Sequence, residues 1–160
     1  MKRFFGLMIG AMLMVSGNAH AEDLKTETIK DWRVICNETS QCVASQVISV
    51  KRDDKLQNVL TLTLVKATNG QVNLEYKLPF GLDLRPGIVT RVDLADEDNL
   101  PFVTCMPDGC IAVMQMTDER MAAFKKGAKL TVGFRPLGAE NTVAIEASLS
   151  GFTAASAAVK

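Results

Sequence analysis

The most distinctive chemistry in this 160-residue chain comes from four cysteines, which form two close pairs, Cys36 with Cys42 and Cys105 with Cys110. The second pair encloses Met106–Gly109, where proline sets the backbone angle of a turn and glycine closes it. Apolar residues flank this turn, so the segment 101–112 is predicted to be a β-hairpin. Opposed residues of an antiparallel pair lie about 4.5–5.5 Å apart, a distance that a disulfide can span.

The cysteine spacing also bears on two other functions of cysteine, thiol–disulfide exchange and zinc binding. Thiol–disulfide exchange at Cys105 and Cys110 is one hypothesis, but known oxidoreductases use Cys-x-x-Cys within alternating strands and helices. A zinc site built from all four cysteines does not match the spacing of a zinc ribbon. Two structural disulfides are therefore favoured. Each local pair flanks a polar turn, which favours local pairing, and a crossed pairing that joins the two hairpins is the alternative.

An N-terminal targeting signal is predicted from the first 21 residues. Lys2 and Arg3 precede the uncharged apolar run Phe4–Val15, and small residues ending in Ala-x-Ala follow. This arrangement is typical of a secretory signal peptide cleaved after Ala21, and the apolar run is shorter than the roughly 20 residues of a membrane-spanning helix. The mature protein is then Glu22–Lys160, exported to an oxidising compartment where disulfides persist.

The composition of the predicted mature chain excludes several functions. The sole histidine, His20, lies in the signal, so histidine-dependent nucleophiles and histidine metal sites are excluded. The acidic residues of 93–98 lack the glycine and distal glutamate of a calcium-binding EF-hand loop, which predicts a solvated turn. We expect no enzymatic activity, no cofactor and no metal site.

Charge and length favour one domain that does not bind nucleic acid. Removal of Lys2 and Arg3 leaves 16 basic and 18 acidic side chains, whereas nucleic-acid binding needs a concentrated basic surface. No second apolar run approaches membrane-spanning length, so the mature protein is expected to be soluble or peripherally attached. Residues 22–160 are long enough to bury a core as a single domain.

Hydrophobic periodicity predicts an all-β fold. Residues 22–30 are charged and aperiodic, which predicts a flexible lead-in. Period-two alternation and turn signals then predict strands at 31–36, 42–51, 57–66, 71–78, 88–94, 130–135 and 143–149, besides the two hairpin arms. One short helix is expected between Thr117 as its N-cap and Gly127, and the tail 151–159 is either a strand or a helical turn. The expected architecture is an antiparallel β-sandwich or flattened barrel of about eight strands with one short helix.

Two loops are the expected interaction surfaces, because loops carry most binding residues. They are 78–87, with two prolines and two glycines, and the hairpin turn at 106–109. The candidate contact residues are Phe80, Leu82, Arg85, Pro107 and Asp108. The partner class is a protein or an envelope component. Glycan binding by surface aromatic residues is a further hypothesis, with these candidates: Trp32, Tyr76, Phe80 and Phe102.

Several short segments, in order and spacing, resemble the invasion-associated locus B family of exported bacterial proteins. These segments are Trp32–Cys36, Cys42–Gln46, Leu78–Gly81 with Leu84 and Pro86-Gly87, Pro101-Phe102, Gly109–Ala112 and Leu149–Ala155. The resemblance covers nearly the whole mature region. It implies a periplasmic, outer-membrane-associated or secreted protein, linked in some pathogens to entry into host cells. It implies no enzymatic activity and no catalytic residues.

Overall fold

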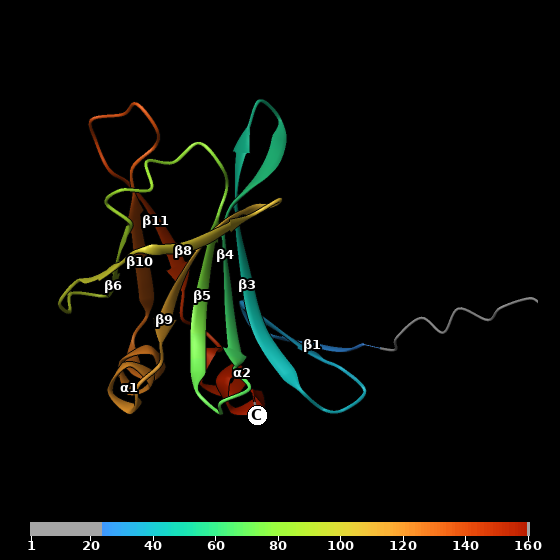
Figure 1. The fold of residues 1–160 in the computed structure, drawn as a ribbon. Helices are drawn as coiled ribbons and strands as arrows, with labels where there is room; N and C mark the ends of the chain where they lie inside the picture. Colours follow the sequence, from blue (N-terminus) through green and yellow to red (C-terminus); the bar gives the residue numbers. More distant parts are fainter. Residues whose placement is uncertain (1–23, 160) are drawn as a thin grey trace, which may run out of the picture.

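The computed structural model describes residues 24–159, which form two antiparallel sheets packed as a sandwich (Figure 1). The larger sheet has seven strands in the order β1-β2-β3-β4-β5-β9-β8, and the smaller has four in the order β11-β10-β6-β7. The predicted sandwich is confirmed, and the two sheets do not close into a barrel. The signal-peptide prediction for residues 1–21 lies outside the described residues.

The bounds of the elements agree with most of the predicted strands. The larger sheet contains β1 (Lys25–Ile29), β2 (Trp32–Cys36), β3 (Cys42–Arg52), β4 (Lys55–Lys66), β5 (Val72–Leu78), β8 (Phe102–Met106) and β9 (Gly109–Gln115). The smaller sheet contains β6 (Ile88–Val92), β7 (Asp98–Leu100), β10 (Lys129–Phe134) and β11 (Val143–Ser148). The two helices are α1 (Asp118–Lys126) and α2 (Phe152–Ala158).

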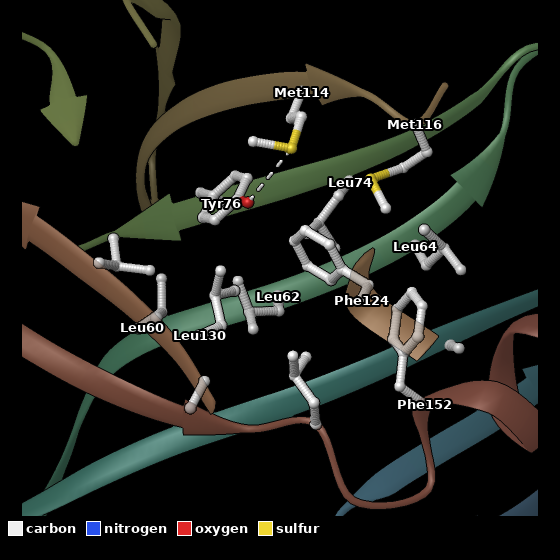
Figure 2. Close-up of a cluster of buried hydrophobic side chains, with 14 of the residues drawn as sticks. Leu60, Leu62, Leu64, Leu74, Tyr76, Met114, Met116, Phe124, Leu130 and Phe152 are labelled. Atoms are coloured by element: carbon white, nitrogen blue, oxygen red, sulfur yellow. Dashed lines mark hydrogen bonds between the residues drawn. The ribbon is translucent and has the colours of Figure 1, made fainter. Parts of the chain in front are cut away.

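Alternating side chains of the central strands fill the space between the sheets. On β4, Leu60, Leu62 and Leu64 are all fully buried, whereas the residues between them face outward. The register pairs Leu62 with Tyr76 of β5, whose hydroxyl contacts the sulfur of Met114 in the same core (Figure 2). Burial of one such side chain contributes about 1.5–3 kcal/mol, so the period-two pattern determines which face becomes the core.

Two predictions about the fold are wrong: the flexible lead-in, and the number of strands and helices. The lead-in contains β1, which pairs residue by residue with β2 although its side chains are mostly exposed. The acidic segment is an exposed turn over 93–97, as predicted, and only its last residue, Asp98, belongs to the short strand β7, where it pairs with Thr90 of β6 and its carboxylate binds Arg120. The described residues therefore contain eleven strands and two helices rather than about eight strands and one helix.

Helix α1 begins and ends at the capping residues that the sequence predicts. The side chain of Thr117 accepts a hydrogen bond from the backbone N–H of Arg120 at the N-terminus of α1. Gly127 ends the helix, and a Cβ at this position would lie only 2.3 Å from a methyl carbon of Val92. Glycine is therefore required here by close packing of the helix end against β6.

Aromatic residues and the two helices close one end of the sandwich, which we call the helix end (Figure 1). Phe152 of α2 packs edge-on against Trp32 with ring centroids 5.2 Å apart, and its ring lies 5.4 Å from that of Phe124 of α1. The indole N–H of Trp32 donates to the carbonyl of Ser148, 116 residues later. The tail 151–159, which the sequence left as either a strand or a helical turn, thus contains a helix that packs against the first strands. Neither helix of residues 24–159 has the length and apolar character needed to cross a membrane.

Candidate functional site: the loop end

The four cysteines form the two local disulfides that the sequence favours, not the crossed pairing. Cys36 is joined to Cys42 and Cys105 to Cys110, with Cα–Cα distances of 4.0 and 3.9 Å. Each pair occupies directly opposed positions of an antiparallel hairpin. Among the described residues no reduced thiol is left, so nothing in the structure favours the thiol-exchange hypothesis over structural disulfides.

Three connections reach the end of the sandwich opposite the helices, and we call this the loop end (Figure 1). They are the β3–β4 turn, the segment 79–87 that joins β5 to β6, and the segment 135–142 that joins β10 to β11. The β3–β4 turn lies within the larger sheet, and segment 79–87 runs from the larger sheet to the smaller one. Segment 135–142 lies within the smaller sheet. The loop end therefore brings together segments from both layers.

Backbone contacts tie the second and third segments together. The N–H of Asp83 donates to the carbonyl of Arg135 at 2.9 Å, and the N–H of Leu137 donates to the carbonyl of Gly81 at 2.8 Å. Leu82 and Pro136 form an isolated antiparallel bridge between these two hydrogen bonds. The two loops thus form a short ribbon across the top of the sandwich, which limits their motion relative to each other.

A buried carboxylate reinforces this ribbon. The Asp83 side chain is only 7% exposed, and the guanidinium of Arg85 donates to both of its oxygens at 2.8 Å. Arg135 donates to one of the same oxygens from Nε at 3.1 Å and from Nη2 at 2.6 Å. We call this group of three side chains the Asp83 clamp. Bidentate arginine–carboxylate pairs have a fixed geometry, so the clamp orients both loops.

The electrostatics of the clamp favour the ionised carboxylate. The hydrogen bonds from Arg85 hold the pKa of Asp83 well below its usual range; burial opposes this effect, and Arg135 reinforces it. The same contact raises the pKa of Arg85 above its usual value. The Asp83 carboxylate therefore stays ionised near neutral pH, where it faces two guanidinium groups.

Large apolar side chains are exposed on the two clamped loops. Phe80 is 59% exposed, Leu84 is 43% exposed and Leu137 is 71% exposed. We call these three residues the apolar tips. Because Leu137 is hydrogen-bonded to Gly81, its loop lies beside the one that carries Phe80. Apolar side chains exposed on ordered loops are candidates for a surface that another molecule covers.

The structure divides the predicted contact residues between two places. Phe80 and Arg85 are exposed at the loop end, whereas Leu82 is half-buried and packs against the core. Pro107 and Asp108 lie at the exposed turn of the β8–β9 hairpin. The ammonium of Lys77 donates to the Asp108 carboxylate, which lowers the pKa of Asp108 and holds the turn against β5.

Sequence reasoning missed four residues of the loop end: Asp83, Leu84, Arg135 and Leu137. The closeness of Asp83 to Arg85 in the sequence is compatible with an ion pair between them. The contact of Asp83 with Arg135 spans 52 residues and becomes visible only when the two sheets are packed. Leu137 stands between a proline and a glycine, and no periodic pattern marks it as exposed.

Burial removes two of the four aromatic residues proposed for glycan stacking. Trp32 and Tyr76 are both fully buried, and burial raises the pKa of the Tyr76 hydroxyl. Neither ring face is therefore available to a sugar. Phe80 is the proposed aromatic residue with a largely exposed side chain.

The described residues also contain a shallow cleft of about 710 Å³ on the outer face of the larger sheet. It is lined by side chains such as Leu24, Ile35, Val43 and Val65, and it lies away from the Asp83 clamp. Within residues 24–159, no group of three side chains is arranged to hold a metal ion. The loop end is thus a part of the described surface where charged side chains, ordered loops and exposed apolar side chains lie together.

Comparison with known proteins decides the family. The model of the invasion-associated locus B protein family matches residues 32–160. The chain belongs to this family. Two curated relatives, both named invasion protein B homologues from strains of Brucella abortus, are 37% identical over 132 residues, covering 81% of this chain and 75% of the relative.

A solved structure shows the same fold in another member of the family. The crystal structure of invasion-associated protein B from Bartonella henselae matches with a TM-score of 0.72 and 22% identity. The match covers 84% of this chain and 95% of that chain. The β-sandwich is thus shared at low sequence identity.

Proposed function

We propose that this protein is a non-enzymatic, exported interaction protein that binds through its loop end. The observation that carries the proposal is the exposure of Phe80, Leu84 and Leu137 on two loops that are fixed by the Asp83 clamp. Exposed apolar side chains are unfavourable in water unless a partner covers them. Loops that are already ordered lose little conformational freedom on binding, which favours affinity.

Export is supported by the two disulfides and by the signal-like pattern at the start of the chain. Disulfides persist in compartments beyond the cytoplasm, and each cysteine pair here is closed. The periplasm, the outer-membrane surface and the medium all fit these features. The names of the Brucella relatives support a contribution to host-cell invasion, and a contribution to envelope integrity also fits an exported binding protein.

Photo-crosslinking in intact cells tests the proposal. We would replace Phe80 by benzoylphenylalanine, which keeps an aromatic side chain at this position, and identify both protein and lipid adducts by mass spectrometry. The matched control carries the same group at Leu94, which is 93% exposed in the β6–β7 turn away from the loop end. Adducts at position 80 that are absent at position 94 are expected. Equal labelling at the two positions would contradict the proposal.

A further inference from the structure

We infer that the outer edge of β1 pairs with the β1 edge of a second copy of this chain and joins the two larger sheets into one. This edge lies apart from the loop end, so the inference goes beyond the proposed function (Figure 1). In the sheet formed by residues 24–159, β1 is the last strand at one edge. A strand in this position presents unpaired backbone N–H and C=O groups, which are a template for another strand.

The register of the β1–β2 hairpin shows which backbone groups face outward. Ile29 pairs with Trp32 across a two-residue turn. Residues that flank such a turn exchange both backbone hydrogen bonds, and the pattern then alternates along the two strands. Thr26 and Thr28 therefore direct their backbone N–H and C=O groups away from β2. The side chains of residues 25–28 are all exposed, so this edge is accessible to another chain.

The side chains of β1 match those of a second β1 in one antiparallel alignment. When Thr26 lies opposite Thr26 of the second copy, each Lys25 lies opposite Glu27 of the other copy. These two positions exchange no hydrogen bonds, so their Cβ atoms lie about 4.5–5.5 Å apart, and opposite charges stabilise such a pair. A two-fold axis at Thr26 forms this contact twice, as a symmetric dimer requires.

The same charges disfavour the neighbouring alignments. A shift of the second strand by two residues keeps the hydrogen-bonding pattern, but it places Glu27 opposite Glu27 in one direction and Lys25 opposite Lys25 in the other. Like charges that are directly opposed destabilise a strand pair. The ion pairs found within residues 24–159 involve other side chains, so both charges of β1 are available to select the alignment through Thr26.

The other edge strands of the described sheets are less suited to self-pairing. β8, at the opposite edge of the larger sheet, contains a bulge between Phe102 and Thr104, and bulges interrupt pairing. β7 of the smaller sheet has only three residues. β11 carries one charged residue, Glu146, and its carboxylate is already paired with Lys129. β1 thus combines an uninterrupted edge with both signs of charge.

An apolar contact adds to the charge match. Leu24 directly precedes β1, is 52% exposed and borders Ile35, the residue that pairs with Thr26. In the same alignment Leu24 lies opposite Thr28 of the second copy. Thr28 borders a cleft of about 360 Å³ that Ile35 and Val47 also line. Leu24 of each copy therefore covers apolar side chains of the other.

Sedimentation velocity of the mature, disulfide-bonded protein over a range of concentrations tests the inference. We expect a dimer with a Kd in the micromolar range that weakens with salt, because pairing through a five-residue strand forms a small interface. Glu27→Lys places lysines opposite each other, and Lys25→Glu places glutamates opposite each other. Each variant alone is therefore expected to raise the Kd by about tenfold or more.

An equimolar mixture of these two variants tests the alignment itself. In a mixed pair every glutamate at positions 25 and 27 faces a lysine, so heterodimers are expected to form about as well as dimers of the unchanged protein. Glu140→Lys is the matched control, because it makes the same change in net charge at an exposed position of segment 135–142. It is expected to dimerise like the unchanged protein. Circular dichroism of each variant confirms that it is folded.

Cysteine crosslinking gives a second readout of the alignment. Thr26→Cys is expected to form a covalent dimer on mild oxidation, because this position faces itself across the two-fold axis. Thr28→Cys is the control, since it lies opposite residue 24 of the second copy and is expected to crosslink much less. Non-reducing electrophoresis compares the two variants, and mass spectrometry confirms that the native disulfides are intact.

Several outcomes would overturn the inference. They are a protein that stays monomeric at every concentration, single charge variants that dimerise as well as the unchanged protein, and a mixture of the two that does not restore dimers. Faster crosslinking at position 28 than at position 26 would overturn it too. None of these results changes the adducts expected at Phe80, because that residue belongs to the loop end and not to the β1 edge.

Discussion

The two ends of the sandwich are built by different physical means. At the helix end, Trp32, Phe124 and Phe152 are buried against one another under two helices. At the loop end, ion pairs and backbone hydrogen bonds order the loops, and apolar side chains remain in water. Both ends are therefore ordered. Only the loop end, which is held by polar contacts, leaves apolar side chains exposed to a partner. The exposure of the apolar tips is therefore compatible with a stable fold.

The largest expected effect comes from the aromatic cluster at the helix end. Phe152→Ala removes a fully buried ring and leaves a cavity next to Trp32, so we expect a loss of about 3–5 kcal/mol in the free energy of unfolding. Urea denaturation followed by tryptophan fluorescence measures it, because Trp32 is the sole tryptophan. A loss below about 1 kcal/mol would show that the helix end is not closed by packing.

The two disulfides, which close the β2–β3 and β8–β9 hairpins, are expected to contribute equally to stability. Double substitution of Cys105 and Cys110 by alanine, or of Cys36 and Cys42, opens a loop of similar length, and each is expected to cost about 2 kcal/mol by the chain-entropy relation. Urea denaturation under non-reducing conditions compares the two variants. A difference of more than about 2 kcal/mol would show that one hairpin stabilises the fold by more than the closure of a short loop.

The Asp83 clamp predicts a pH-dependent stability at the loop end. Because the folded protein lowers the pKa of Asp83, its stabilising effect is complete above the unfolded-state pKa of about 4 and declines as the pH falls below it. We expect Asp83→Asn to lower Tm by about 3–5 °C at pH 7, with the difference from the unchanged protein shrinking in acid.

Asp96→Asn is the matched control for this measurement, because Asp96 is an exposed carboxylate in the β6–β7 turn. Thermal unfolding from neutral pH to below pH 4 by circular dichroism records both variants. A constant difference in Tm for Asp83→Asn across this range would show that its charge does not stabilise the loop end.

The smallest effects are expected at the apolar tips. Phe80→Ser and Leu137→Ser remove side chains that are more than half exposed, so each is expected to change the free energy of unfolding by no more than about 0.5 kcal/mol. Urea denaturation alongside Phe152→Ala gives the contrast directly. A loss of about 2 kcal/mol or more at either position would mean that the side chain supports the fold and is not free for a partner.

The sequence predicted those parts of the fold whose hydrophobic alternation or capping residue lies within the segment itself. Leu60, Leu62 and Leu64 alternate with polar or smaller residues, and Thr117 caps a helix from within the same segment. β1 carries no such signal, because pairing with β2 holds it without burying an alternate face. The Asp83 clamp joins residues 52 positions apart, and no local pattern encodes that distance.

The two loops also differ in how much of them could be predicted. Phe80 lies in the predicted interaction loop 78–87 and is a candidate contact residue from the sequence alone, and the structure shows that it is exposed. For the partner loop at 135–142, the sequence predicts only that it connects the strands at 130–135 and 143–149. Its role at the loop end depends on the packing of the smaller sheet over the larger one, which brings Leu137 beside Gly81.

The contact between Trp32 and the C-terminal segment sets the order in which the core can be completed. The carbonyl that accepts the Trp32 N–H belongs to Ser148, and the ring that packs on Trp32 belongs to Phe152. A chain that emerges from its N-terminus must therefore wait for its last elements before the first strands gain their native cover. Until α2 has been synthesised, Trp32 therefore lacks both the carbonyl and the aromatic ring that cover it in the folded protein.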